Sequence, residues 1–251
     1  MQSKGWEIGT TFSLIQKADL SWLAHVNWTQ NAARITQFPA GVLPFTIGAA
    51  GGFGNAYGRL RFAPGFSASQ IYGNVKNADG TTTLGGPIAD ANPTYLMTFS
   101  NEWTWKRLSF SAMVDYRRGG YLSDMTLNLF DEGVNTWDYD NPSPKAGVPL
   151  GKYRYDNWAA GANTAQYITN GSYTKVREIN VGYELSSHWV SLIPGAKSAR
   201  ASVSGRNLWI ISGYNGFDPE VNNGGNQVAR FVDLAPFPPS RNVFFSLDIG
   251  F

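Results

Sequence analysis

The sequence of 251 residues contains no cysteine and only two histidines, His25 and His188. Without thiols there is no disulfide framework, no cysteine nucleophile and no thiolate metal site. Neither histidine stands in a motif that pairs a serine nucleophile with a base, and no His, Asp and Glu residues have metal-ligand spacing. The sequence therefore predicts no enzyme activity, no cofactor and no metal site.

Charged residues are also scarce, at 15% of the chain against the roughly 25% typical of soluble domains. The 20 basic and 18 acidic residues nearly cancel, so no basic surface indicates a nucleic-acid partner. An uncharged stretch at 35–58 contains Pro39, Pro44 and several glycines, which exclude a membrane-spanning helix there. Abundant instead are aromatic residues, at 14%, and glycine, with 28 residues.

Apolar and polar residues alternate with a period of two in segment after segment, which is typical of β-strands. Seven segments show this clearly: 6–14, 20–29, 95–105, 108–116, 173–185, 199–211 and 241–251. A weaker strand is expected at 55–62. The stretches 63–93, 119–172 and 212–240 are rich in Gly, Asn, Asp and Pro and are predicted to be long loops. The sequence thus predicts an all-β, antiparallel fold of about eight strands in which short turns alternate with long loops.

Alternation alone fits both a soluble β-sandwich and a transmembrane β-barrel. The charged residues of the strands lie at the positions that alternate with the apolar ones, and so on the opposite face of the strand. They are Glu7, Glu102, Asp115, Glu184, Arg200, Arg206 and Asp248. The other polar positions are mostly Ser, Thr, Asn and Gly, and Trp and Tyr residues gather near strand ends, as in membrane barrels. These features favour a barrel with Trp22, Ala24 and Val26 facing outward and Asp115 and Asp248 inward, while a sandwich remains the alternative.

The last predicted strand ends with the chain. It alternates Val243, Phe245, Leu247, Ile249 and Phe251 with more polar positions. This pattern resembles the terminal signal that the outer-membrane assembly machinery reads in barrel proteins. The alternative is an ordinary half-buried strand.

Three stretches of the C-terminal third resemble the SusC/RagA family of TonB-dependent outer-membrane transporters. They are GSYTKVREINVGYEL at 171–185, ASVSGRNLW at 201–209 and GFDPEV at 216–221. Upstream, GWEI at 5–8, NPTY at 92–95 and residues 110–120 are similar to the family's preceding hairpins, in the same order. Residues 85–93 are longer than the corresponding family run, and 77–80 lack the acidic repeat of some members, so no calcium site is expected.

The resemblance implies more than this chain contains, because such transporters have an N-terminal plug inside a barrel of about 22 strands. Residues 1–251 are therefore expected to be the C-terminal part of the barrel of a larger transporter, without its plug domain and signal peptide. Strands 5–14 and 241–251 should then be free edges. The alternative is a small stand-alone barrel with a structural or adhesive role.

The function that the resemblance implies is TonB-dependent nutrient import across the outer membrane of a Gram-negative bacterium. The expected substrates are oligosaccharides or oligopeptides. The expected partners are a SusD-like surface lipoprotein, TonB through the missing N-terminal part, and the lipid and assembly machinery of the outer membrane.

The loop at 119–172 contains a group of aromatic residues beside carboxylates and amides. Flat rings can stack on a sugar or peptide while neighbouring polar groups bind its hydroxyls or amides. The sequence therefore predicts ligand binding by Trp137, Tyr139, Tyr153, Tyr155 and Trp158. Alternatively, these rings pack the loop onto itself or onto the partner lipoprotein.

Overall fold

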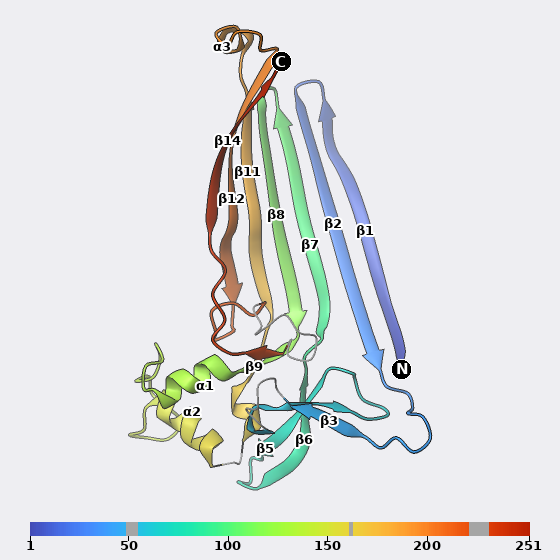
Figure 1. Cartoon of the computed structure of the whole chain (residues 1–251), viewed down its shortest axis with the longest axis vertical. Coiled ribbons are helices and arrows are strands. Elements are labelled where there is room, and N and C mark those ends of the chain that lie inside the picture. Colours follow the sequence, from blue (N-terminus) through green and yellow to red (C-terminus); the bar gives the residue numbers. More distant parts are fainter. Residues whose placement is uncertain (49–54, 161–162, 221–230) are drawn as a thin grey trace.

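The structure of this chain, a computed structural model, describes residues 1–48, 55–160, 163–220 and 231–251. Seven long strands run side by side in one antiparallel sheet along the long axis of the molecule (Figure 1), in the order β1-β2-β7-β8-β11-β12-β14. Their bounds are β1 (Gln2–Lys17), β2 (Leu20–Arg34), β7 (Pro93–Trp105), β8 (Leu108–Gly119), β11 (Tyr173–Glu184), β12 (Ser198–Ser212) and β14 (Asn242–Gly250). They coincide with the seven segments of clear alternation.

The pairing register extends this alternation across the whole sheet. Side chains alternate between faces along a strand, and directly opposed residues share a face. One apolar row of opposed residues consists of Trp22, Trp103, Phe110, Val181, Val203 and Phe245. In the opposite phase, Asp115 is opposed by Thr98 and Lys175, and Asp248 by Arg200. The predicted separation of an apolar face from a polar face is therefore confirmed.

The apolar face of the large sheet is uncovered in the described part of the chain. Phe99 is 40% exposed, Trp105 57% and Phe245 81%. Large apolar side chains inside a β-sandwich would be enclosed by a second sheet. The exposed row therefore argues against the sandwich alternative.

Aromatic side chains form two belts on this face. Near the tight turns, the rings of Trp22 and Trp103 lie 4.7 Å apart. Near the other end, the ring of Tyr95 lies 6.2 Å from Trp28 and 5.8 Å from Tyr116. Trp105, two residues beyond Trp103 and on the same face, extends the first belt. From Tyr95 to Trp105, β7 covers roughly 34 Å, or about 26 Å along the membrane normal at a barrel strand's usual tilt. This spacing matches the apolar band of about 25 Å in outer-membrane barrels.

The connections at the two ends of the sheet differ in length. At one end, β1 joins β2 and β7 joins β8 through tight turns, and β11 joins β12 through a segment that contains the short helix α3 (Ser187–Val190). At the other end, all three long connections fold into a separate layer (Figure 1). The predicted alternation of short turns and long loops is confirmed.

The strands β1 and β14 are the edges of the large sheet. Within the described residues, β1 pairs only with β2, and β14 only with β12. The expectation of free first and last strands is therefore confirmed. Such edges expose unpaired backbone N–H and C=O groups, which other strands can pair with.

The three long connections form what we call the loop assembly: the described residues of 35–92, 120–172 and 213–241. It contains two small sheets and two helices, and no helix of the described chain is long and apolar enough to span a membrane. One sheet consists of β3 (Phe45–Gly48), β4 (Arg59–Phe62), β5 (Gln70–Lys76) and β6 (Thr82–Asp90); the other of β10 (Ile168–Asn170), β9 (Tyr121–Asp124) and β13 (Val232–Asp233). The helices are α1 (Met125–Glu132) and α2 (Leu150–Ala159).

Most of this structure was not predicted from the sequence. Both helices have at most ten residues, too few for a clear helical period. The strand expected at 55–62 is shorter and belongs to the small sheet, because residues 55–57 form the 3-10 turn η2 (Asn55–Tyr57) and only β4 follows. Asp124 starts α1 by accepting a hydrogen bond from the Leu127 N–H at 3.0 Å, as an N-cap residue does.

The hydrophobic core lies inside the loop assembly and joins its three connections. It consists of Tyr57, Leu60, Ile71, Met125, Phe231 and Val232. The chain enters this layer from β8 through Gly119 and Gly120, whose φ angles of +74° and +77° glycine adopts without strain.

Candidate functional site

The small sheet β3–β6 has two unlike faces near the strand β4. Leu60 lies in the hydrophobic core and Phe62 packs against it. Because residues alternate between faces along a strand, Arg59 and Arg61 lie on the opposite face. There Tyr72 is opposed to Arg59, and Thr46 to Arg61. The alternation therefore places two cations and an aromatic ring on one surface.

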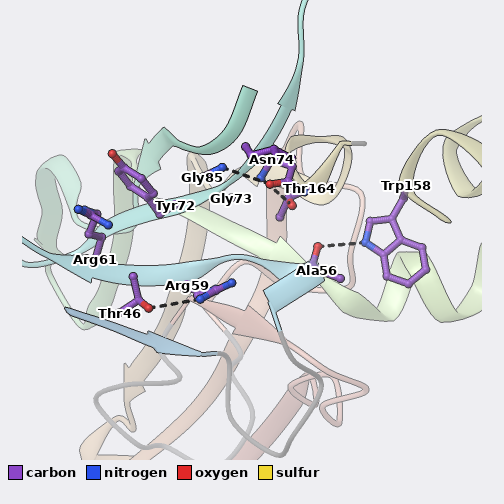
Figure 2. Close-up of a pocket in the computed structure, with 11 residues that line it drawn as sticks. Thr46, Ala56, Arg59, Arg61, Tyr72, Gly73, Asn74, Gly85, Trp158 and Thr164 are labelled. Carbon is purple, nitrogen blue, oxygen red and sulfur yellow. Dashed lines mark hydrogen bonds between the residues drawn. The ribbon is translucent and has the colours of Figure 1, made fainter. Parts of the chain in front are cut away.

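A cavity of about 530 Å³ opens on this surface (Figure 2). We call it the β4 pocket, and it is lined by Thr46, Ala56, Arg59, Arg61, Tyr72, Gly73, Asn74, Leu84, Gly85, Trp158 and Thr164. Its walls come from the small sheet, from α2 and from the 3-10 turn η3 (Thr164–Tyr167). The volume is within the range of about 300–1,000 Å³ of small-molecule sites.

Trp158 is held in place at the wall of this pocket. Its indole N–H donates to the Ala56 carbonyl at 3.1 Å. Its ring lies 4.9 Å from Tyr57, 5.7 Å from Tyr155 and 6.3 Å from Tyr167. A ring fixed on several sides can stack on a ligand without a further loss of conformational freedom.

The five aromatic residues predicted to bind ligand do not form one surface. Tyr155 and Trp158 lie together, and only Trp158 lines the β4 pocket. Tyr139 lies directly against Gly151 of α2, Tyr153 is half-buried on α2, and Trp137 is 62% exposed. Their role in binding stays a prediction.

Arg59, Arg61 and Tyr72 were not predicted as site residues from the sequence. The pattern that could have indicated the two arginines is Arg-Leu-Arg-Phe at 59–62, in which cations and apolar residues alternate. A strand with this pattern places both cations on one face, but the sequence does not show that Tyr72 and Trp158 face them.

A buried ion network holds α2 and Trp158 in position. The guanidinium of Arg154 on α2 donates to both carboxylate oxygens of Asp131 on α1 at 2.7 and 2.6 Å, and to Asp138 at 2.9 and 2.7 Å. Asp131 also accepts hydrogen bonds from Thr136 and Tyr167. These hydrogen bonds link the two short helices to each other.

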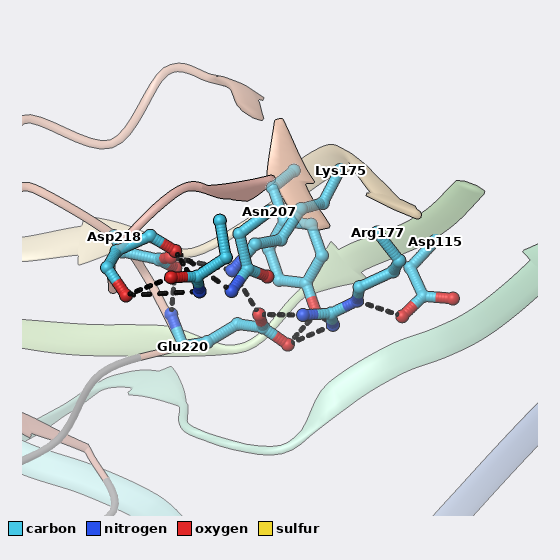
Figure 3. Close-up of polar contacts among 9 residues, drawn as sticks. Asp115, Lys175, Arg177, Asn207, Asp218 and Glu220 are labelled. Carbon is cyan, nitrogen blue, oxygen red and sulfur yellow. Dashed lines mark hydrogen bonds and ion pairs between the residues drawn. The ribbon is translucent and has the colours of Figure 1, made fainter. Parts of the chain in front are cut away.

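A second network joins the loop assembly to the large sheet (Figure 3). Lys175 on β11 contacts Asp218 at 2.7 Å and Glu220 at 2.8 Å. Arg177 contacts Glu220 and Asp115. Burial by itself raises the pKa of Glu220, but hydrogen bonds from Arg177, Lys175 and Tyr173 outweigh it and lower the pKa to about 2. Asp218 and Glu220 of the GFDPEV motif thus anchor the last long connection to the polar face of the sheet.

A third polar group consists of two buried carboxylates on the neighbouring strands β9 and β13. Asp124 and Asp233 are directly opposed and 0% and 1% exposed. Burial, together with the nearby Asp233 and Asp131, raises the pKa of Asp124 to about 7, although the Leu127 N–H and the Arg154 charge act against this. Burial also raises the pKa of Asp233, against its hydrogen bonds from Thr126 and Tyr214.

The loop assembly is therefore expected to lose stability as the pH rises. In the unfolded chain the Asp124 carboxyl loses its proton near pH 3.8, whereas in the folded protein it keeps the proton up to about pH 7. The proton therefore stabilises the folded state fully below pH 3.8, and this stabilisation is lost as the pH rises through about 7. Hydrogen exchange of the α1 amides, corrected for its intrinsic pH dependence, should increase from pH 5 to pH 8.

Asp124→Asn is the variant that checks this expectation. Asparagine keeps the N-cap hydrogen bond but does not titrate, so most of the pH dependence should disappear. An unchanged pH dependence in Asp124→Asn would assign the effect to another group.

The described residues do not gather metal-binding side chains in one place. No cluster of three or more His, Asp or Glu residues that could hold a metal ion occurs among them. His25 lies on the polar face of the large sheet, 2.9 Å from the Thr11 hydroxyl, and His188 lies in α3, at the opposite end of the molecule from the loop assembly (Figure 1).

Comparison with known proteins identifies relatives along the whole chain, although no family model matches it. The TonB-dependent receptor P3 of Formosa agariphila is 24% identical over 298 residues, which cover 100% of this chain and 29% of the receptor. The TonB-dependent receptor SusC of Bacteroides thetaiotaomicron is 25% identical over 187 residues, which cover 70% of this chain and 17% of SusC.

Solved structures share the fold. A chain of the RagAB peptide importer in its closed-closed state has a TM-score of 0.69 at 17% identity, over 98% of this chain and 29% of the importer chain. In the open-open state the TM-score is 0.72 at 18% identity, over 99% and 28%. The present chain thus spans less than a third of the length of these proteins. The resemblance to the SusC/RagA family is confirmed: this chain is similar along its whole length to part of a TonB-dependent receptor, and over 70% of its length to part of SusC.

Proposed function

We propose that this chain is the C-terminal part of the barrel of a TonB-dependent transporter in the outer membrane of a Gram-negative bacterium. The observation that carries the proposal is the large sheet with two unlike faces and two free edges, combined with similarity to such receptors along the whole chain. In this proposal the apolar face contacts lipid, and the polar face lines the lumen. A plug domain and the TonB contact belong to parts of the protein outside these residues.

The two aromatic belts support the membrane position. Trp and Tyr concentrate where barrel strands cross the lipid headgroups, and the belts are separated by about the thickness of the apolar band. Closure into a barrel requires that other strands pair with β1 and β14, because hydrocarbon offers no partner for exposed backbone groups.

The loop assembly lies on the outer side of the membrane in this proposal and receives the substrate. Its cavity and its aromatic residues suit an oligosaccharide or an oligopeptide, and the relatives include proteins named SusC and a peptide importer. The exposed Trp137 suits contact with a SusD-like surface lipoprotein that covers the loop assembly. The stand-alone structural or adhesive barrel is less favoured, because a closed barrel of seven strands would leave no free edges.

Uptake by whole cells tests the proposal. Cells with the full-length protein should accumulate labelled oligosaccharides or oligopeptides, and deletion of either its gene or the gene for TonB should abolish accumulation. A tagged form of the protein should co-purify with a surface lipoprotein. Normal insertion without any uptake, together with a loss of cell adhesion on gene deletion, would instead favour the adhesive barrel.

The C-terminal strand is proposed to be the assembly signal, through Val243, Phe245, Leu247, Ile249 and Phe251. Deletion of Phe251 from the full-length protein should lower its amount in the outer membrane several-fold, while the molecules that do insert keep their ligand affinity. The reason is that Phe251 is 72% exposed at the end of an edge strand, far from the loop assembly (Figure 1). Quantitative blotting of membrane fractions measures the amount, and normal insertion with weakened binding would contradict this role.

A further inference from the structure

We propose that the β4 pocket binds the carboxylate of an acidic ligand and that Arg59 and Arg61 recognise it. The inference deepens the proposed function. It rests on that function in one respect, because it assumes that the pocket faces the imported substrate.

The two guanidinium groups have no carboxylate partner. Neither Arg59 nor Arg61 forms an ion pair with any acidic residue of the described chain, and the undescribed stretches contain no Asp or Glu. Other arginines of this protein behave differently: Arg154 and Arg177 each bind two carboxylates. Two unpaired cations in one cavity create a positive potential that favours an anion.

The donors of these side chains are only partly used. Arg59 donates to the Thr46 hydroxyl at 3.4 Å, which is a long hydrogen bond. The Nε atom of Arg61 is buried and has no hydrogen-bond partner in the described part of the chain. This buried Nε atom lies too deep for a ligand to reach. A ligand would instead meet the two terminal nitrogens of Arg61, which are not among the buried atoms and receive no hydrogen-bond partner from the described residues.

The orientation of Arg61 suits a planar anion. Its guanidinium lies over the ring of Tyr72, 4.9 Å from the ring centre. Stacking holds the plane of the guanidinium while its edge stays free to donate, and this edge matches the two oxygens of a carboxylate.

The remaining walls define the rest of the ligand. Trp158 offers a fixed ring and Leu84 an apolar surface. The cavity of about 530 Å³ holds a few sugar or amino-acid residues. The geometry thus suits a short chain that carries a carboxylate beside a flat apolar face. Such a carboxylate can come from a uronic acid of an oligosaccharide or from the C-terminus of a peptide.

Calorimetric titration of the purified full-length protein distinguishes these sources. The probes are tetragalacturonate and its methyl ester, and the tetrapeptide Ala-Ala-Ala-Phe with a free or an amidated C-terminus. At least one free acid should bind about tenfold or more tightly than its neutral counterpart, as expected for a charge-assisted hydrogen-bonded pair. The preferred acid identifies the source.

The variant Arg59→Gln/Arg61→Gln should abolish the preference for the acid while the neutral probe binds as before. Lys145→Gln/Arg107→Gln is the matched control, because it also removes two positive charges, both at exposed positions outside the pocket. Far-ultraviolet circular dichroism checks that both variants are folded.

Equal affinity for the acid and the neutral probes would overturn the inference. A preference for the acid that persists in the Arg59→Gln/Arg61→Gln variant would also overturn it, as would an absence of binding by both acids at millimolar concentration. These outcomes are separate from the uptake assay. TonB-dependent uptake without a preference for the acid would contradict the carboxylate site but not the proposed transport function. A preference for the acid without uptake would contradict the transport function but not the carboxylate site.

Discussion

Replacement of Arg154 by methionine is expected to destabilise the loop assembly by about 3–5 kcal/mol, the cost of leaving a buried charge without its partner. Arg154 is 6% exposed, and Asp131 is 2% exposed. Methionine fills a similar volume but donates no hydrogen bond, so Asp131 keeps only its contacts with Thr136 and Tyr167. Hydrogen exchange of the α1 and α2 amides in the folded protein measures the effect.

Lys152→Met provides the control on the same helix. Lys152 and Asp156 form an exposed pair one turn apart, with side chains 54% and 51% exposed. Such pairs contribute about 0.3–0.5 kcal/mol, so exchange should barely change. Similar losses in both variants would show that the buried network does not fix the helices.

Val114→Arg is expected to lower the stability of the membrane-inserted protein by about 2–4 kcal/mol, the cost of arginine in the middle of the lipid face of a barrel. Val114 opposes Phe99 on β7, and Phe99 is four residues from Tyr95 and six from Trp105. The substitution therefore places a charge between the two aromatic belts. Urea titration of the folded protein in lipid vesicles measures the change.

Ser111→Arg on the same strand should change stability by less than about 0.5 kcal/mol, as for an ordinary surface substitution. Ser111 lies in the polar phase, where Glu102 and Asn180 oppose it. Equal tolerance of arginine at both positions would contradict the assignment of the two faces.

The sequence was sufficient to predict the large sheet, because its strands are long and one row of each is consistently apolar. Residues such as Trp22, Trp103 and Phe110 occupy one phase in three segments, and the pairing register aligns them. The free edges followed from the family resemblance, which implied more strands than this chain contains.

The loop assembly could not be predicted in the same way, because its structure depends on contacts between residues far apart in the sequence. Arg154 meets Asp131 across 23 positions, and Lys175 meets Asp218 across 43. The β4 pocket likewise needs Trp158 beside β4, and no local pattern encodes that proximity. The predicted aromatic group contains Trp158, which lines the β4 pocket, but it did not reveal the arginines of that pocket, and its role in binding stays a prediction.

Spin-label accessibility along β8 tests the central claim most directly. This chain has no cysteine, so in the full-length protein, with any cysteine outside these residues replaced by serine, single cysteines from 109 to 114 can each carry one nitroxide label in lipid vesicles. Labels at Phe110, Ala112 and Val114 should collide with lipid-soluble oxygen, and labels at the alternate positions with a water-soluble nickel complex. Accessibility without a period of two, or nickel contact along the apolar row, would contradict the claim that this face of the sheet lies in lipid.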